Sequence, residues 1–256
     1  MLDNIEHVGP LFEPVAEVRA AEKTGVPDYL RQHYWWAYIH PKAVRFFDRP
    51  WLINLILLGN YRRLRDAALE EFSDGKIGNV LQIACAYGDL TSQLTRRIAT
   101  KAGRIDIVDV LPIQLRNTKW KLPGRSPARL LCMDSTDLKL PDARYDWVLL
   151  FFLLHEQPSS HRLRTLKEAF RVVKPGGKVL IVDYARPKWW NPLRYLWPPL
   201  LAVLEPFALD LWREDLASWL PPGGEAVSCK REDFFGGFYQ KVVMTRPGPK
   251  SVAPDH

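Results

Sequence analysis

Short apolar runs alternate with amphipathic stretches through the middle of the chain. The runs are rich in Val, Ile and Leu, as buried strands are. They cover residues 80–84, 105–108, 129–132, 147–152 and 179–182. Between them, apolar positions recur with helical spacing over residues 91–99, 112–121 and 159–173. This alternation predicts an α/β fold, in which a mainly parallel sheet carries helices on both faces.

The segments that flank this alternation follow other patterns. Residues 27–73 have a helical pattern that is broken at Pro41 and Pro50, which predicts two helices in an N-terminal helical cap. Residues 185–224 are rich in aromatic residues and Pro, and we expect them to form an aromatic helical insertion after the fifth strand.

The length of 256 residues suits one domain with appendages. Two last strands, expected over 226–232 and 236–245, complete a seven-stranded sheet. The predicted organisation is a flexible arm over 1–26, the cap over 27–73, the core over 74–184, the insertion over 185–224, C-terminal strands over 225–247 and a disordered tail over 248–256.

Charge and cysteine usage narrow the choice of partners and compartment. The 36 Lys and Arg residues exceed the 29 Asp and Glu residues, which gives a net charge of +7. A basic chain suits an anionic membrane surface or nucleic acid, but no nucleic-acid-binding module is visible, so we expect no nucleic-acid partner. Cys85, Cys132 and Cys229 are odd in number and widely spaced, which predicts reduced core thiols in the cytoplasm. Residues 1–17 lack the apolar stretch of a signal peptide.

The first apolar run leads into a loop with the frame of a nucleotide-binding site. Residues 80–91 read Val-Leu-Gln-Ile-Ala-Cys-Ala-Tyr-Gly-Asp-Leu-Thr. A buried strand, a sharp turn and a helix present backbone N–H groups to such a ligand. The usual pattern is acid-x-Gly-x-Gly-x-Gly. Gln82 stands at the acid, Ala84 and Ala86 stand at the first two glycines, and Gly88 alone is kept.

With these motifs in order, residues 76–184 resemble a class I S-adenosylmethionine (SAM)-dependent methyltransferase domain. Asp109 matches the ribose-binding acid, the pair Asp134 and Ser135 matches the adenine contact, and residues 145–147 and 174–177 match the segments that open the fourth and fifth strands. The resemblance implies a Rossmann-like fold with SAM as cofactor. The expected SAM contacts are Gln82, Ala84, Tyr87, Gly88, Asp109, Val110, Asp134 and Ser135.

A second set of motifs covers nearly the whole chain and resembles the RquA family of rhodoquinone-biosynthesis proteins. The matching segments are 34–38, 82–89, 108–110, 115–117, 151–158 and 204–212. This resemblance implies conversion of ubiquinone to rhodoquinone, in which an amino group replaces a ring methoxy group. It also implies SAM as amino donor and manganese (Mn²⁺) as cofactor.

The altered loop has a chemical interpretation. A neutral Gln82 removes the negative charge that holds the α-amino group of SAM as an ammonium, which favours the free base, the nucleophile of an amino transfer. Sequence drift that keeps small residues near the ligand is the alternative. Tyr87 is bulky for such a turn, so we expect it to line the SAM pocket or to face the second substrate, with plain core packing as the alternative.

His155 and Asp183 follow the predicted fourth and fifth strands and should face one cleft. By analogy with metal-dependent catechol methyltransferases, we nominate both as manganese ligands and, with Tyr87, as catalytic residues, and Glu156 as a spare ligand. Alternatively, His155 is a metal-free general base or a capping group, and Asp183 is a turn acid that contacts Arg186.

Trp and Tyr residues crowd the cap and the insertion among Arg and Lys side chains, as at a membrane interface. We expect a cytoplasmic protein that is peripheral on the inner face of the membrane, where ubiquinone and an anionic surface are its partners. A lid without lipid contact is the alternative for the insertion. Two other functions stay open: an orthodox methyltransferase acting on a quinone or quinone precursor, and a non-catalytic subunit of a quinone-biosynthesis assembly.

Overall fold

A computed structural model describes residues 19–20, 25–38, 40–213, 216–219 and 227–248. Most of the predicted arm, including the stretch examined for a signal peptide, lies outside the described residues. The same holds for all but the first residue of the predicted tail.

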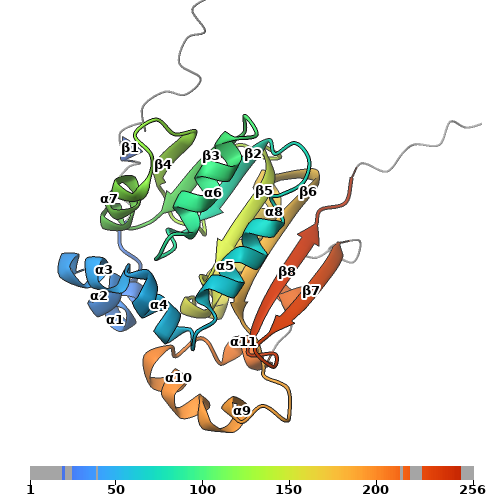
Figure 1. The fold of residues 1–256 in the computed structure, drawn as a ribbon. Coiled ribbons are helices and arrows are strands. Elements are labelled where there is room, and N and C mark those ends of the chain that lie inside the picture. The colour runs from blue at the N-terminus through green and yellow to red at the C-terminus, as the bar shows by residue number, and fades with distance from the viewer. Residues whose placement is uncertain (1–18, 21–24, 39, 214–215, 220–226, 249–256) are drawn as a thin grey trace, which may run out of the picture.

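An eight-stranded sheet forms the centre of the molecule, in the order β1-β4-β3-β2-β5-β6-β8-β7 (Figure 1). The strands are β1 (Arg19–Ala20), β2 (Asn79–Ile83), β3 (Arg104–Asp109), β4 (Ala128–Cys132), β5 (Tyr145–Phe151), β6 (Val173–Tyr184), β7 (Ser228–Phe234) and β8 (Tyr239–Thr245). Strands β1 to β6 are parallel, whereas β8 runs antiparallel to β6 and β7. The predicted seven-stranded, mainly parallel sheet is confirmed, and the two-residue β1 adds an edge strand.

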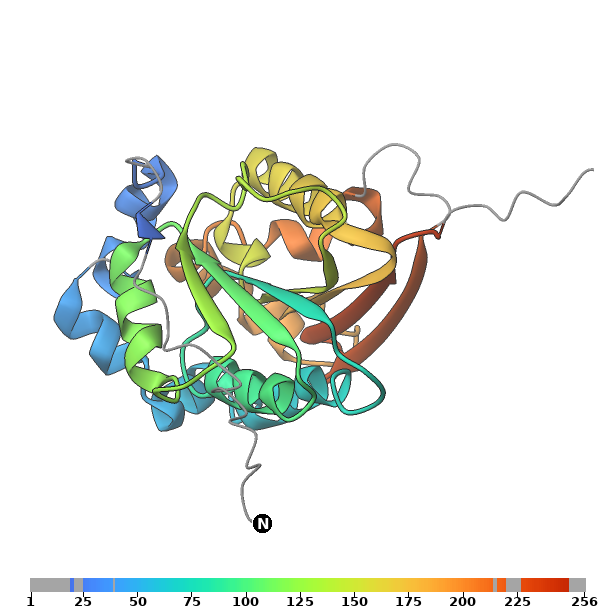
Figure 2. The same ribbon diagram turned by 90° about the horizontal axis from the view of Figure 1, so that it is seen from above.

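Three core helices lie where the helical spacing places them: α6 (Leu90–Ala99), α7 (Pro112–Lys121) and α8 (Ser159–Val172). Helix α5 (Tyr61–Glu70) joins α6 on one face of the sheet, and α8 covers the other face (Figure 2). Both faces are therefore shielded from water, and β2, β5 and the second half of β6, from Val179 to Tyr184, are mostly buried, as parallel strands between two helical layers are.

The cap contains more helices than expected. It consists of α1 (Asp28–His33), α2 (Trp35–Tyr38), α3 (Pro41–Phe47) and α4 (Pro50–Ile56), followed by α5. The two-helix prediction was wrong because Pro41 and Pro50 each occupy the first helical position, where the missing N–H has no intrahelical partner to lose. These prolines start helices as well as ending the preceding segment.

The insertion forms α9 (Leu193–Leu196), α10 (Pro198–Leu204), α11 (Asp210–Arg213) and a 3₁₀ turn over Leu216–Trp219. Helices α9 and α10 lie at the same end of the molecule as the cap, beyond the carboxyl ends of the parallel strands (Figure 1). None of the described helices is long and apolar enough to cross a membrane.

One local expectation is confirmed and another needs correction. Residues 174–177 open the fifth strand as expected, because they belong to β6, whose irregular start pairs Tyr145 with Val173 and then Trp147 with Lys178. The prediction of three core thiols fails for Cys229, which is exposed on β7, while Cys132 is buried and Cys85 is half-buried.

Candidate active site

A cavity of about 510 Å³ opens at the carboxyl ends of the parallel strands, between the cap and the insertion. Ligands in open α/β sheets bind at this edge. The predicted site residues in its wall are Ala84, Tyr87, Asp109, Val110, Asp134, Ser135 and His155. Gln82, Gly88 and Asp183 are not part of the wall, so the structure places them behind it.

The loop after β2 keeps its shape although two glycines are missing. Ala84 has φ of 70° and its N–H donates to the carbonyl of Val108 at 2.8 Å. A left-handed alanine costs about 1 kcal/mol, which the surrounding contacts must offset. Gly88 has φ of 82°, and a Cβ there would clash with the Tyr61 hydroxyl. The one retained glycine is therefore the one that the packing requires.

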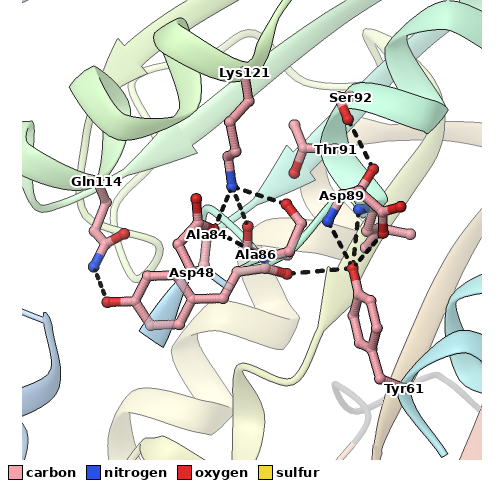
Figure 3. Close-up of polar contacts among 12 residues, drawn as sticks. Asp48, Tyr61, Ala84, Ala86, Asp89, Thr91, Ser92, Gln114 and Lys121 are labelled. Carbon is pink, nitrogen blue, oxygen red and sulfur yellow. Dashed lines mark hydrogen bonds and ion pairs between the residues drawn. The ribbon is translucent and has the colours of Figure 1, made fainter. Parts of the chain in front are cut away.

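Side chains from the cap and from α7 clamp the loop from behind (Figure 3). The Asp48 carboxylate accepts the N–H of Gly88 at 2.9 Å and pairs with the Lys121 ammonium at 2.7 Å. Lys121 also donates to the carbonyls of Ala86 at 3.3 Å and Gly88 at 3.0 Å. These bonds satisfy the polar backbone groups on the rear of the loop.

Tyr61, the first residue of α5, ties the end of the loop to α6 (Figure 3). Its hydroxyl oxygen accepts the N–H groups of Asp89 at 2.8 Å and Leu90 at 3.1 Å, and it donates to the Asp89 carboxylate at 2.9 Å. Two N–H groups at the start of α6 are thus satisfied by the cap.

Gln82 is fully buried at the end of β2. Its amide nitrogen donates to the carbonyl of Ala84 at 3.0 Å and to the hydroxyl of Thr91 at 2.9 Å, while its amide oxygen has no partner among the described residues. The side chain braces the turn against α6, and it brings an uncharged group to the position of the usual acid.

Asp109 lies in the cavity wall at the end of β3. Its two carboxylate oxygens accept the N–H groups of Cys85 and Leu111, each at 2.8 Å. Burial raises the pKa of Asp109 to about 6, and these N–H donors oppose that shift. Asp134 and Ser135 lie nearby: the Asp134 carboxylate accepts the N–H of Thr136 at 2.8 Å, leaving its other oxygen for a ligand.

Tyr87 connects the loop to the cap across the cavity. Its hydroxyl donates to the carbonyl of Ala37 at 2.8 Å and accepts the amide of Gln114 at 2.8 Å. Its ring stacks on Tyr38, with centroids 5.5 Å apart. The Tyr87 side chain is held in a fixed orientation, in which it lines the cavity and also packs against the edge of the core.

His155 and Asp183 form a buried dyad. The Asp183 carboxylate contacts His155 Nδ1 at 2.8 Å and accepts the N–H groups of Leu154 at 2.9 Å and Tyr184 at 2.8 Å. Despite burial, the Asp183 carboxylate helps to raise the pKa of His155 to about 9. Asp183 therefore fixes the imidazole orientation from behind, and only His155 faces the cavity.

Two further carboxylates approach the free nitrogen of His155. Its Nε2 lies 3.8 Å from Glu156 Oε1 and 3.9 Å from Glu205 Oε2. The Tyr38 hydroxyl donates to Glu156. Burial raises the pKa of Glu156 to about 8 and also raises that of Glu205. The imidazole and the two carboxyl groups can share and move protons inside an otherwise apolar wall.

The nominated manganese pair does not fit a shared ion. Asp183 is almost fully buried, and both of its oxygens already accept hydrogen bonds. Its contact with Nδ1 leaves His155 with one nitrogen toward the cavity. Across the described part of the chain, no group of three or more His, Cys, Asp or Glu side chains is arranged to hold a metal ion.

Several site residues were missed from the sequence. Glu205 and Tyr38 lie in segments that carried the family resemblance, which was their only signal. Tyr34 also lies in such a segment, and its buried hydroxyl lies near the Glu205 carboxylate without a hydrogen bond of ordinary geometry. The clamp residues Asp48 and Lys121 carry no local sequence signal.

Comparisons with known proteins agree with this geometry. The model of the ubiE/COQ5 methyltransferase family matches residues 48–197. An uncharacterized methyltransferase of Synechocystis sp. is 27% identical over 82% of this chain and 94% of its own length. The ubiquinone/menaquinone biosynthesis C-methyltransferase UbiE of Stutzerimonas stutzeri is 31% identical over 53% of this chain, and the match spans only 54% of UbiE.

Solved structures share the fold at low identity. A SAM-dependent methyltransferase from Aquifex aeolicus has a TM-score of 0.51 at 19% identity, covering 80% of this chain and 98% of its own. A possible exported protein from Bordetella parapertussis has a TM-score of 0.59 at 13% identity, covering 86% of each chain. Since the family match spans more than half of the sequence, the chain belongs to the ubiE/COQ5 methyltransferase family of class I SAM-dependent methyltransferases.

Proposed function

We propose that the protein converts ubiquinone to rhodoquinone by exchanging a ring methoxy group for an amino group, with SAM as amino donor. The observation that carries the proposal is the polar corner of the cavity. There, Glu205 Oε2 lies 3.9 Å from His155 Nε2 and also near the Tyr34 hydroxyl, with no hydrogen bond of ordinary geometry to either group, while the rest of this wall is largely apolar. Buried polar atoms without partners mark a place where a ligand supplies them. The carbonyl and methoxy oxygens of a quinone ring can accept hydrogen bonds from the Tyr34 hydroxyl and from the His155 imidazole.

The SAM side of the cavity also fits its ligand. Asp109 and Asp134 both line the cavity. We assign the Asp109 carboxylate to accept the ribose hydroxyls and Asp134 to contact the adenine amino group, as the resemblance implies. Left-handed Ala84 opens the turn without a side chain large enough to block the ligand. When bound, SAM would supply the group that is transferred.

A methoxyquinone is a vinylogous ester, so an amine can add to the ring carbon and methoxide can leave. The new C–N bond forms, the C–O bond to the methoxy group breaks, and one N–H proton passes to methoxide to give methanol. The SAM α-nitrogen is then bonded to the ring, so the bond between this nitrogen and the SAM α-carbon must break to release rhodoquinone. Elimination with loss of a proton from the SAM β-carbon breaks this bond without an oxidant. We assign this proton movement to His155, whose orientation Asp183 fixes, together with Glu205. The Tyr34 hydroxyl is assigned to donate to a ring carbonyl and so stabilise the negative charge that develops there. These roles hold with or without the manganese ion that the resemblance implies.

Gln82 supports amino rather than methyl transfer. A carboxylate at this buried position would favour the ammonium form of the SAM amino group, which is not nucleophilic. The amide in its place carries no charge, so the free base is more accessible near neutral pH.

The second candidate is methylation of a quinone or quinone precursor. It is favoured by the name of the UbiE relative, a C-methyltransferase of ubiquinone and menaquinone biosynthesis. In that reaction the same dyad would remove a proton from the substrate ring or hydroxyl.

One labelling experiment separates the candidates. Purified protein is incubated with SAM and either ubiquinone or a ubiquinone precursor that lacks a ring methyl group, with and without Mn²⁺. Parallel reactions use SAM labelled with ¹⁵N at the α-amino group or with ¹³C at the methyl group. Products are identified by mass spectrometry, and the His155→Ala variant gives the background.

Amino transfer puts the nitrogen label into the quinone. Methyl transfer puts the carbon label there instead, which would overturn the proposal. A non-catalytic subunit incorporates neither label with ubiquinone or its precursors.

A further inference from the structure

The exposed apolar side chains of this protein are not scattered. Sixteen large apolar residues are exposed in the described part of the chain, and all but Trp120, Leu163 and Phe235 lie on two segments. We call these segments together the apolar rim. It consists of Trp35, Trp36, Phe46, Trp51, Leu55 and Ile56 from the cap, and Trp189, Trp190, Tyr195, Leu196, Leu200, Val203 and Leu204 from the insertion.

The apolar rim adjoins the active-site cavity on the side of the cap and on the side of the insertion. Five of its members also line the cavity, and they come from both segments: Trp36, Leu55, Ile56, Leu200 and Leu204. The cap helices and helices α9 and α10 share one end of the molecule (Figure 1). The apolar surface outside therefore continues into the apolar wall inside without a polar collar.

The helices of the rim are apolar on the side where a surface helix is normally polar. Helix α10 buries Leu201 against the body and exposes Leu200 and Val203, the latter at 78%. Helix α4 likewise buries Ile53 and exposes Leu55, at 65%. Helices that are apolar all round are found in an apolar environment. They are too short to span a bilayer, so they suit the bilayer surface.

The positive charge around the rim favours an anionic lipid bilayer over a second copy of this chain as the partner of the rim. Lys42, Arg45, Arg49 and Lys188 are exposed on the two segments. Residues 186–204 contain no Asp or Glu. Between residues 35 and 63 the only acid is Asp48, which Lys121 and the loop already engage. An apolar surface with unopposed cations matches anionic lipid headgroups above an acyl layer. Two copies meeting across a two-fold axis would instead bring these cations together.

We infer that the apolar rim docks on an anionic lipid bilayer, with α4 and α10 lying in the headgroup region and the cavity mouth opening into the acyl layer. The docking itself does not depend on the reaction. Combined with the proposed function, it means that the quinone ring enters the cavity while its apolar tail stays in the bilayer.

Vesicle flotation of the full chain, without any substrate, tests the docking. Neutral phosphatidylcholine vesicles are compared with vesicles that also contain phosphatidylglycerol, at low and high salt. The wild type should float with the anionic vesicles, and salt should reduce this binding. The double variant Trp189→Ser/Trp190→Ser should bind about tenfold less because apolar area at the interface is lost. Arg45→Glu/Arg49→Glu should lose the preference for anionic vesicles.

Trp120→Ser is the matched control, since Trp120 is 87% exposed on α7, outside the rim. It should bind like the wild type, and circular dichroism and SAM affinity should show that every variant is folded. Equal flotation of all variants, or none by the wild type, would overturn the inference. A dimer in light scattering that the Trp189→Ser/Trp190→Ser variant abolishes would show that a second copy covers the rim instead. Because no turnover is measured, a failed amino transfer leaves this result unaffected.

Discussion

The two walls of the cavity are built in different ways. The wall at the ends of β2, β3 and β4 consists of strand ends and the loop that follows β2, and it carries Asp109 and Asp134. The opposite wall joins His155, after β5, to Tyr34 of the cap and Glu205 of the insertion. The first wall is formed by two consecutive βαβ units, β2-α6-β3 and β3-α7-β4. The second needs three segments that are remote in the chain to dock correctly.

We therefore expect one wall to bind SAM and the other wall to carry out proton transfer. The strand-end wall offers fixed acceptors for a nucleoside and resembles what the fold provides in general. The docked wall holds the groups that can move protons, and its composition depends on appendages to the fold. Substitutions in the two walls should therefore change different quantities.

The largest effect is expected from Asp183→Asn. The amide can hold the imidazole in the wrong tautomer, so kcat should fall by about 10²- to 10³-fold while SAM affinity stays near the wild-type value. Manganese content, measured by plasma mass spectrometry, should not change if Asp183 orients His155. Loss of bound manganese would return Asp183 to the role of a ligand, and loss of SAM binding would indicate misfolding.

Asp109→Asn should change SAM affinity rather than kcat. Replacing a charge-assisted acceptor of the ribose hydroxyls should weaken SAM binding by about 1.5–3 kcal/mol, or roughly 10- to 150-fold, in titration calorimetry. At saturating SAM, kcat should be close to that of the wild type. An unchanged SAM affinity would remove Asp109 from the nucleoside site.

Gln82→Glu tests whether the uncharged loop matters for amino transfer. We expect turnover to fall about five- to tenfold near neutral pH and to recover at higher pH, because the added charge raises the pKa of the SAM amino group by about one unit. Gln82→Met, which loses the same hydrogen bonds without adding a charge, is the control. If both variants lose activity equally at all pH values, the bracing of Ala84 and Thr91 explains the effect.

The smallest effect concerns stability and pH. Glu156 has a folded pKa of about 8, above its ordinary value of 4.5, so the stability linked to its proton is complete below pH 4.5 and is lost as the pH rises through 8. His155 adds a similar loss between 6.5 and about 9. In Glu156→Gln, the Tm should fall less between pH 5 and 8, by a few degrees Celsius, than in the wild type, measured by differential scanning fluorimetry. Parallel Tm curves would mean that Glu156 is ionised throughout.

The strand-end wall could be predicted because its signals are local. Helical spacing predicted both the first and the last residue of α7. The position of Asp109 at the end of a predicted strand indicated that it would line the cavity. The role of Asp183 could not be predicted in the same way. A carboxylate at a strand end serves equally as a ligand or as an orienting acceptor, and only the position of its hydrogen-bond donors decides between them.

The meeting of Tyr34 and Glu205 in the docked wall could not be predicted from the sequence, for a different reason. Tyr34 and Glu205 are more than 170 positions apart, and no periodicity connects residues at that separation. Their meeting depends on how the cap and the insertion pack on the core. A buried hydroxyl without a partner also has no sequence signature, because partners are defined only in three dimensions.

The cap holds the loop that follows β2, so the position of the cap should affect SAM affinity. Asp48 grips the N–H of Gly88 from the end of α3, and the same helix carries Phe46 of the apolar rim. Anything that shifts α3 also shifts the loop, so the two events share one free-energy cycle. By reciprocity, the factor by which docking on lipid changes SAM affinity equals the factor by which SAM changes lipid affinity. Under the inferred docking, an anionic bilayer and SAM would therefore each change the affinity of the protein for the other by the same factor.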